Sequence, residues 1–125
     1  MSNKILYVDD EVINLELFKI NFKNDYSIFV ADSAQKGLEI LKNENINVVI
    51  SDLRMPHMNG IDFIDKVKKE KPATVCILLT AFMESEAMFK AINEELVYRY
   101  IMKPWKKDEI KEVIDSAFKR LGQKD

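Results

Sequence analysis

The chain has 125 residues and a formal net charge of −2, with acidic and basic residues mixed along its length. This length predicts one domain, residues 1–125, with its own hydrophobic core, and the charge balance disfavours nucleic-acid binding. No apolar stretch approaches the ~18 residues of a membrane span, and no signal-peptide pattern is present. A single cysteine cannot form an internal disulfide, which fits a reducing compartment. We therefore expect a cytoplasmic domain without direct contact to nucleic acid or membrane.

Five short apolar runs alternate with amphipathic segments along the chain. We predict that the runs are strands, in chain order at 4–8, 26–31, 46–51, 74–79 and 97–102. Apolar side chains at helical spacing predict helices over 11–23, after Ser33, after Gly60, over 84–93 and over 106–121. The first helix is expected to bury Val12, Leu15, Phe18 and Phe22.

The apolar runs are continuous rather than alternating, which indicates strands that are covered on both faces and hence a parallel sheet. Right-handed crossovers then place helices on both sides. For five such units we predict an α/β fold, a doubly wound, flavodoxin-like (βα)5 sheet with strand order 2-1-3-4-5. In this order a crevice opens beyond the carboxyl ends of the first and third strands.

Reactive polar residues follow four of the five predicted strands. Asp9 and Asp10 follow the first strand and Asp52 the third, while Thr80 and Lys103 follow the fourth and fifth. Unit charges about 4 Å apart repel by roughly 4 kcal/mol at an effective dielectric constant of 20. Three close carboxylates therefore require a counter-charge, and Mg²⁺ is the cation that suits them.

This set of residues also suits a phosphoryl group. A carboxylate can act as nucleophile toward phosphorus and become an aspartyl phosphate. Lys103 and the hydroxyl of Thr80 can hold phosphoryl oxygens. Each residue alone has an ordinary explanation, because an acidic pair after a strand is most often a helix N-cap. The prediction depends on all of them meeting at one edge of the sheet.

With these residues assembled, the chain resembles the receiver domain of two-component response regulators over essentially its whole length. The most specific piece is the stretch from Asp52 to Gly60, which matches the family pattern D-x-x-M-P-x-M-x-G. The acidic pair, Thr80 followed by a small residue, and Lys103-Pro104 are present in the family order. The resemblance implies a signalling domain that catalyses only its own phosphorylation and dephosphorylation.

The resemblance also implies a role for each acidic residue. Asp52 would accept a phosphoryl group from the phosphohistidine of a sensor histidine kinase or a phosphotransfer protein. Asp10 and Asp52 would ligate Mg²⁺ directly, and Asp9 mostly through water. The backbone carbonyl of Arg54 would be a further ligand.

The remaining family positions concern the conformational switch. Thr80 and Lys103 would hold phosphoryl oxygens, and the ring of Tyr100 would turn inward as Thr80 moves toward the phosphate. The Lys103-Pro104 peptide bond would be cis. Many members also form homodimers through the fourth helix, fifth strand and fifth helix, where Phe89 is either an exposed docking residue or part of the core.

The chain departs from the family in several places. Residues 92–100 lack the glycine that many receivers carry before the fifth strand. The Lys103-Pro104-Trp105 variant looks like receivers fused to kinases or cyclic-dinucleotide phosphodiesterases, which suggests a domain excised from a larger protein. Arg54 and Phe82 occupy positions that tune dephosphorylation, so the lifetime of the phosphorylated form is left open.

Two other functions occur on a similar sheet, and the sequence disfavours both. A metal-dependent phosphatase with an aspartate nucleophile usually has a second Asp two residues later, where this chain has Arg54. A flavin-binding module needs a Ser/Thr/Gly-rich phosphate cradle, whereas the loop after the first strand is acidic. His57, the only histidine, lies at a variable position of the family pattern, and we expect no ligand role for it.

Overall fold

The computed structural model describes residues 3–81 and 95–122. Its strands are β1 (Lys4–Val8), β2 (Ser27–Ala31), β3 (Val48–Asp52), β4 (Val75–Thr80) and β5 (Arg99–Met102). Its helices are α1 (Val12–Phe22), α2 (Ala34–Asn43), α3 (Gly60–Glu70) and α5 (Lys107–Gly122). The helix predicted over 84–93, with Phe89, and the position of Phe82 lie outside the described residues.

All five strands are parallel and lie in the order β2-β1-β3-β4-β5, which confirms the predicted fold class. Val8 of β1 pairs with Ser51 of β3, so these strands end side by side. Asp52 in turn pairs with Leu79 of β4. The carboxyl ends of β1, β3 and β4 therefore form one continuous edge, and the residues that follow them are neighbours.

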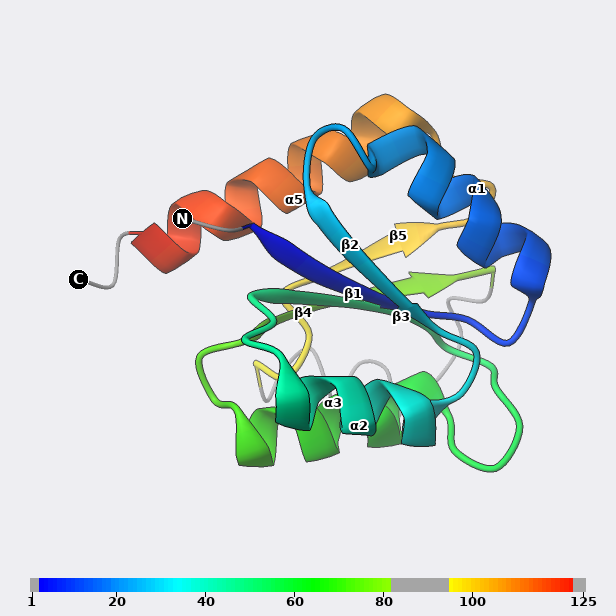
Figure 1. Ribbon diagram of the computed structural model, residues 1–125, viewed down its shortest axis with the longest axis vertical. Helices are drawn as coiled ribbons and strands as arrows, with labels where there is room; N and C mark the ends of the chain where they lie inside the picture. The colour runs from blue at the N-terminus through cyan, green and yellow to red at the C-terminus, as the bar shows by residue number, and fades with distance from the viewer. Residues whose placement is uncertain (1–2, 82–94, 123–125) are drawn as a thin grey trace.

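The helices form a layer on each face of the sheet (Figure 1). Helices α1 and α5 cover one face, and α2 and α3 cover the other. Side chains alternate along β1, with Ile5 and Tyr7 facing α1 and α5, and Leu6 and Val8 facing the opposite layer. All four are fully buried. Burial on both faces explains why the strands read as continuous apolar runs.

Local signals fix the starts of two helices. Asp32 and Ser33 are both plausible caps from the sequence, and the structure shows that Ser33 is the cap, because its side chain accepts a hydrogen bond of 3.2 Å from the backbone N–H of Lys36. Asn59, which was not predicted as a cap, accepts a hydrogen bond of 2.8 Å from the backbone N–H of Asp62. These side chains satisfy N–H groups that have no partner within the helix.

The burial predicted for α1 is correct at Leu15, Phe18 and Phe22 but wrong at Val12, which is 60% exposed. At 3.6 residues per turn, Val12 lies about 90° from the centre of the buried face. The residues Ile13, Leu17 and Ile20 are also exposed. They surround the direction opposite the core, so α1 is apolar on both its inner and its outer side.

Cys76 belongs to the core. It is 1% exposed, and burial raises the pKa of its thiol to about 12, which makes the thiol unreactive. Within residues 3–81 and 95–122, no helix is both long and apolar enough to cross a membrane.

Candidate functional site

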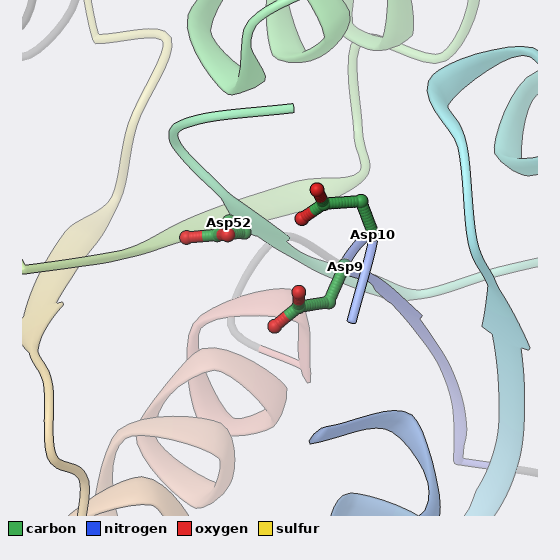
Figure 2. Close-up of side chains that lie close together, drawn as sticks. All are labelled: Asp9, Asp10 and Asp52. Atoms are coloured by element: carbon green, nitrogen blue, oxygen red, sulfur yellow. The ribbon is translucent and has the colours of Figure 1, made fainter. Parts of the chain in front are cut away.

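Three carboxylates meet at the carboxyl edge of the sheet. Asp9 and Asp10 follow β1, and Asp52 is the last residue of β3. Each offers an oxygen atom, and these oxygens all lie within 4.8 Å of one another. Figure 2 shows the three side chains projecting into the same space. Asp9 and Asp52 are buried, whereas Asp10 is exposed and opens the cluster to solvent. The predicted convergence is therefore confirmed.

Lys103 supplies a positive charge to this cluster. Its Nζ atom lies 3.2 Å from Oδ1 of Asp52 and 3.5 Å from Oδ2 of Asp9. The residue follows β5, and its backbone N–H donates a 2.9 Å hydrogen bond to the carbonyl oxygen of Thr80. The Lys103-Pro104 peptide bond is cis, as the resemblance implied. One lysine faces two buried carboxylates, so the site keeps an excess of negative charge.

The carboxylate of Asp9 is held by its neighbours. It accepts hydrogen bonds from the Tyr7 hydroxyl (2.6 Å), the Asn14 side chain (3.1 Å) and the Glu11 backbone N–H (3.0 Å). Burial and then this hydrogen bond raise the pKa of Tyr7 above its usual range, so its hydroxyl remains a donor. Tyr7 and Asn14 support Asp9 although the sequence pattern did not predict this role for them. Tyr7 could have been found, because residues two apart on a strand share a face.

Among the described residues, partners contact only one of the two carboxylate oxygens of Asp52. Its Oδ1 accepts a 3.0 Å hydrogen bond from the backbone N–H of Leu53 and faces Lys103. No hydrogen bond from a residue of the described part reaches Oδ2. Burial raises the pKa of Asp52 and the Asp9 charge adds to this, while Lys103 opposes it. An ionised Asp52 is thus held in an environment that disfavours its charge, which makes it responsive to a cation or an electrophile.

The charge of Lys103 is secured by the same neighbours. Burial acts to lower the pKa of its ammonium group, but the carboxylates of Asp52 and Asp9 outweigh burial and raise that pKa. The side chain therefore stays protonated throughout the neutral range. A fixed ammonium group beside the carboxylate of Asp52 can counter charge that develops on a transferred phosphoryl group.

The loop after β3 is fitted tightly against the site. A Cβ atom on Gly60 would lie 2.2 Å from the carbonyl oxygen of Asp52. The Gly60 backbone N–H donates a 2.7 Å hydrogen bond to the carbonyl oxygen of Leu53. This close approach explains why the D-x-x-M-P-x-M-x-G stretch ends in glycine. His57, in the same loop, is exposed and has a φ of 71°.

The other predicted site residues lie near this edge in different environments. Thr80 ends β4 and is 1% exposed. Arg54 is exposed in the loop after β3. Tyr100 lies on β5 and is 38% exposed, so its ring is directed to the surface. Nothing in the geometry tests the ligand role of the Arg54 carbonyl or the switch role of Tyr100, and both stay predictions.

The donor set fits a hard divalent cation. Mg²⁺ is bound through one or two carboxylates together with water and phosphate oxygens. Asp10 and the free oxygen of Asp52 offer such ligands, and the described residues engage Asp9 more fully than either. Three carboxylates this close repel one another, and the single charge of Lys103 offsets only part of that repulsion.

Comparisons with known proteins show the family to which the chain belongs. The family model described as the response regulator receiver domain matches residues 5–115. The hydrogenase transcriptional regulatory protein HoxA of Bradyrhizobium diazoefficiens is 32% identical over 117 residues, which cover 94% of this chain and 24% of that protein. Sporulation initiation phosphotransferase F of Bacillus subtilis is 30% identical over 115 residues, which cover 91% of this chain and 92% of that protein.

Solved structures agree with the sequence matches. The signal receiver domain of an HD domain-containing protein from Pseudomonas fluorescens superposes with a TM-score of 0.93 at 28% identity, covering 98% of this chain and 99% of that one. Against the regulators of the HoxA type, however, the chain spans only about a quarter of their length. The activities of those longer proteins therefore do not transfer to this chain.

Proposed function

Because the chain belongs to the response regulator receiver domain family, we propose that it is a Mg²⁺-dependent phosphoacceptor of a two-component system, phosphorylated on Asp52. The observation that carries this proposal is the meeting of three carboxylates and Lys103 at the carboxyl edge of the sheet. Receiver domains are signalling domains that work with histidine kinases or phosphotransfer proteins and bind Mg²⁺ at an acidic pocket. The identity of the residues that carry out each step here is part of the proposal.

In the proposed reaction, Oδ2 of Asp52 attacks the phosphorus atom of a phosphohistidine. A P–O bond to Asp52 forms while the P–N bond to the imidazole breaks, and the imidazole nitrogen keeps that electron pair. Lys103 and the Thr80 hydroxyl hold phosphoryl oxygens and counter their charge. Bound Mg²⁺, held by Asp10, Asp52 and the Arg54 carbonyl with Asp9 behind a water, would supply further charge neutralisation.

The proposed output is a change of conformation at Thr80 and Tyr100. Phosphorylation adds about −1.5 to −2 charges, by analogy with other phosphorylated residues. Shifting a two-state equilibrium from 1:99 to 99:1 needs about 5.5 kcal/mol of differential interaction. In this proposal Thr80 moves toward the phosphate and the ring of Tyr100, now 38% exposed, turns inward. A homodimer through the segment around β5 and α5 belongs to the same proposal.

The assignment of Asp52 is tested by phosphorylation with phosphoramidate and Mg²⁺, followed by intact-mass measurement. We expect one phosphoryl adduct on the unmodified chain and none on Asp52→Asn. The matched control is Asp65→Asn, which removes a carboxylate that pairs with Lys69 on α3. Addition of a chelator should abolish labelling of both the parent and the control. Labelling that persists in Asp52→Asn would overturn the assignment.

We further propose that the phosphodonor protein docks on the outer face of α1. Val12, Ile13, Leu17 and Ile20 are 46–73% exposed there. A groove of about 480 Å³ beside this face is lined by Leu17, Trp105 and Lys103, so the apolar surface is continuous with the phosphoacceptor site. An amphipathic helix of the donor fits a surface of this kind.

The docking proposal is tested with a panel of purified histidine kinase catalytic cores. Ile13→Ser should lower the rate of transfer from the best kinase at least tenfold more than it lowers phosphorylation by phosphoramidate. The control, Glu16→Ser, changes an exposed polar residue of the same helix. Equal losses for both donors would show that Ile13 does not mediate docking.

A further inference from the structure

A second cavity lies at the opposite end of the sheet from Asp52. Its volume is about 210 Å³, and it opens where β4 and β5 begin. The floor is apolar and buried, and includes Val75, Cys76 and Val97. The rim carries charged residues from three different elements, namely Lys68, Arg99 and Arg120, together with one carboxylate, Glu95. The proposed phosphoacceptor function uses none of these residues.

Two guanidinium groups gather around one aromatic ring at this rim. The Cζ atoms of Arg99 and Arg120 lie 4.4 Å and 5.1 Å from the centroid of the Tyr98 ring. That ring is fixed at its far end, because its hydroxyl is 2.9 Å from Oγ of Ser116. Two positive charges thus surround one ring, and like charges near one another are unfavourable unless an anion offsets them.

Among the described residues, neither arginine is neutralised by a carboxylate. Within residues 3–81 and 95–122, no carboxylate forms an ion pair with either guanidinium group. The one hydrogen bond from Arg99 goes to the carbonyl oxygen of Tyr98, at 3.0 Å. Each guanidinium carries five N–H donors in a planar fork that matches a carboxylate. Most of these donors therefore remain available to a ligand.

The lysine at the rim is positioned differently. Nζ of Lys68 donates hydrogen bonds of 2.8 Å to the carbonyl oxygen of Pro72 and 2.9 Å to that of Thr74. These bonds hold its positive charge near the buried floor. Lys68 thus adds to the positive potential of the cavity, while the arginines provide the contacts that can recognise an anion.

We propose that this cavity binds a small carboxylic acid with an apolar body of about the size of benzoate. A cavity of about 150 Å³ lined by apolar side chains holds benzene, so 210 Å³ leaves room for a ring and a carboxylate. The ring would rest on Val75, Cys76 and Val97, and the carboxylate would face Arg99 and Arg120. A bare phosphate would leave the apolar floor unfilled, which is why an aromatic or short aliphatic acid is favoured.

The test is a titration of the full chain with benzoate, followed by backbone amide shifts of residues 95–99 in NMR spectra. Benzyl alcohol, a neutral molecule of similar shape, and inorganic phosphate are titrated in parallel. We expect benzoate to bind at least about fivefold more tightly than either, the factor that roughly 1 kcal/mol of charge-assisted recognition gives. Equal affinity for benzyl alcohol, tighter binding of phosphate, or no saturable shifts with benzoate would overturn the proposal.

Variants that remove either a positive or a negative charge from the rim make the test specific. Arg120→Gln and Arg99→Gln should each weaken benzoate binding about fivefold, and Glu95→Gln should strengthen it, because that change removes a repelling carboxylate. Lys119→Gln is the matched control, since it removes the same charge from the next residue of α5 and does not line the cavity. If Lys119→Gln weakens binding as much as Arg120→Gln, the effect is one of net charge and the site assignment is wrong.

Discussion

The surroundings of the start of β1 and the carboxyl end of the sheet use charged side chains in opposite ways. At the amino end, Lys4 pairs with Glu44 at 2.9 Å, and its backbone N–H donates to the side chain of Asn47 at 3.0 Å. The Thr74 hydroxyl donates to the carbonyl oxygen of Ile46 at 3.3 Å. At the carboxyl end, three carboxylates lie within 4.8 Å of one another and share one lysine.

This contrast separates groups that stabilise the fold from groups that serve a ligand. The polar groups of Lys4, Asn47 and Thr74 have matching partners, so they connect elements without an excess of charge. The carboxyl end gathers charges of one sign, which costs folding free energy in the absence of a counter-charge. A fold keeps such an arrangement when a function requires it. The carboxyl end, where like charges lie close together, is therefore the candidate site. Stability measurements can test this conclusion.

The largest expected effect comes from Gly60, on which the packing of the carboxyl end depends. Gly60→Ala places a Cβ atom 2.2 Å from the carbonyl oxygen of Asp52, which is backbone and cannot move aside cheaply. We expect a loss of about 3 kcal/mol in the free energy of unfolding, at the upper end of overpacking costs. Urea denaturation measures this value, and phosphorylation by phosphoramidate should fall as the position of Asp52 shifts.

Gly122→Ala is the matched control, because nothing lies within 4 Å of the Cβ atom that it adds. Its effect should stay within about 0.5 kcal/mol, as for most surface substitutions. If Gly60→Ala were as mild as this control, the close approach of the loop to Asp52 would not matter for stability or for the site.

The fold could be predicted because local and global signals agree. Continuous apolar runs indicated buried parallel strands, and the observed order is the predicted one. The error at Val12 has a physical origin, since the sequence shows that α1 is apolar but not which of its apolar sides faces the sheet. The backbone before β5 is a second feature that the sequence does not reveal. Glu95 adopts a φ of 63° there, a conformation that residues other than glycine rarely adopt.

The site could be predicted only as far as chain topology reaches. Strand ends bring Asp9, Asp10, Asp52 and Lys103 together once the strand order is known. The hydrogen bonds from Tyr7 and Asn14 to Asp9 depend on side-chain directions within β1 and α1. The cavity at the amino end could not be predicted from the sequence, because residues far apart in the chain line it around Tyr98.

A smaller effect of opposite sign is expected from neutralising Asp52. In metal-free protein, Asp52→Asn should raise the free energy of unfolding by about 1 kcal/mol, a typical size for one substitution. The reason is that burial and the Asp9 charge already raise the pKa of Asp52, so its ionised form is disfavoured in the fold. Thermal or urea denaturation in the presence of EDTA measures the difference.

Addition of Mg²⁺ should make the unmodified chain more stable than Asp52→Asn. A cation that binds only the folded state stabilises it by about 2.7 kcal/mol at a concentration 100 times its Kd. The unmodified chain should gain this stability, while Asp52→Asn, which lacks one proposed ligand, should gain much less. Equal stabilisation of both proteins by Mg²⁺ would place the metal elsewhere and remove the explanation offered for the like charges.

The smallest expected effect comes from the same kind of change at the amino end. Glu44→Gln removes the carboxylate that pairs with Lys4, whose side chain is 24% exposed. We expect a loss of about 0.5 kcal/mol, in the range of partly exposed ion pairs, and no response of this difference to Mg²⁺. A double-mutant cycle with Lys4→Met isolates the pair from other effects of either substitution. If Glu44→Gln instead stabilised the metal-free chain as Asp52→Asn is expected to do, the gain would reflect the net charge of −2 rather than crowding at one end. The sign of this difference therefore decides whether the carboxyl end is electrostatically distinct.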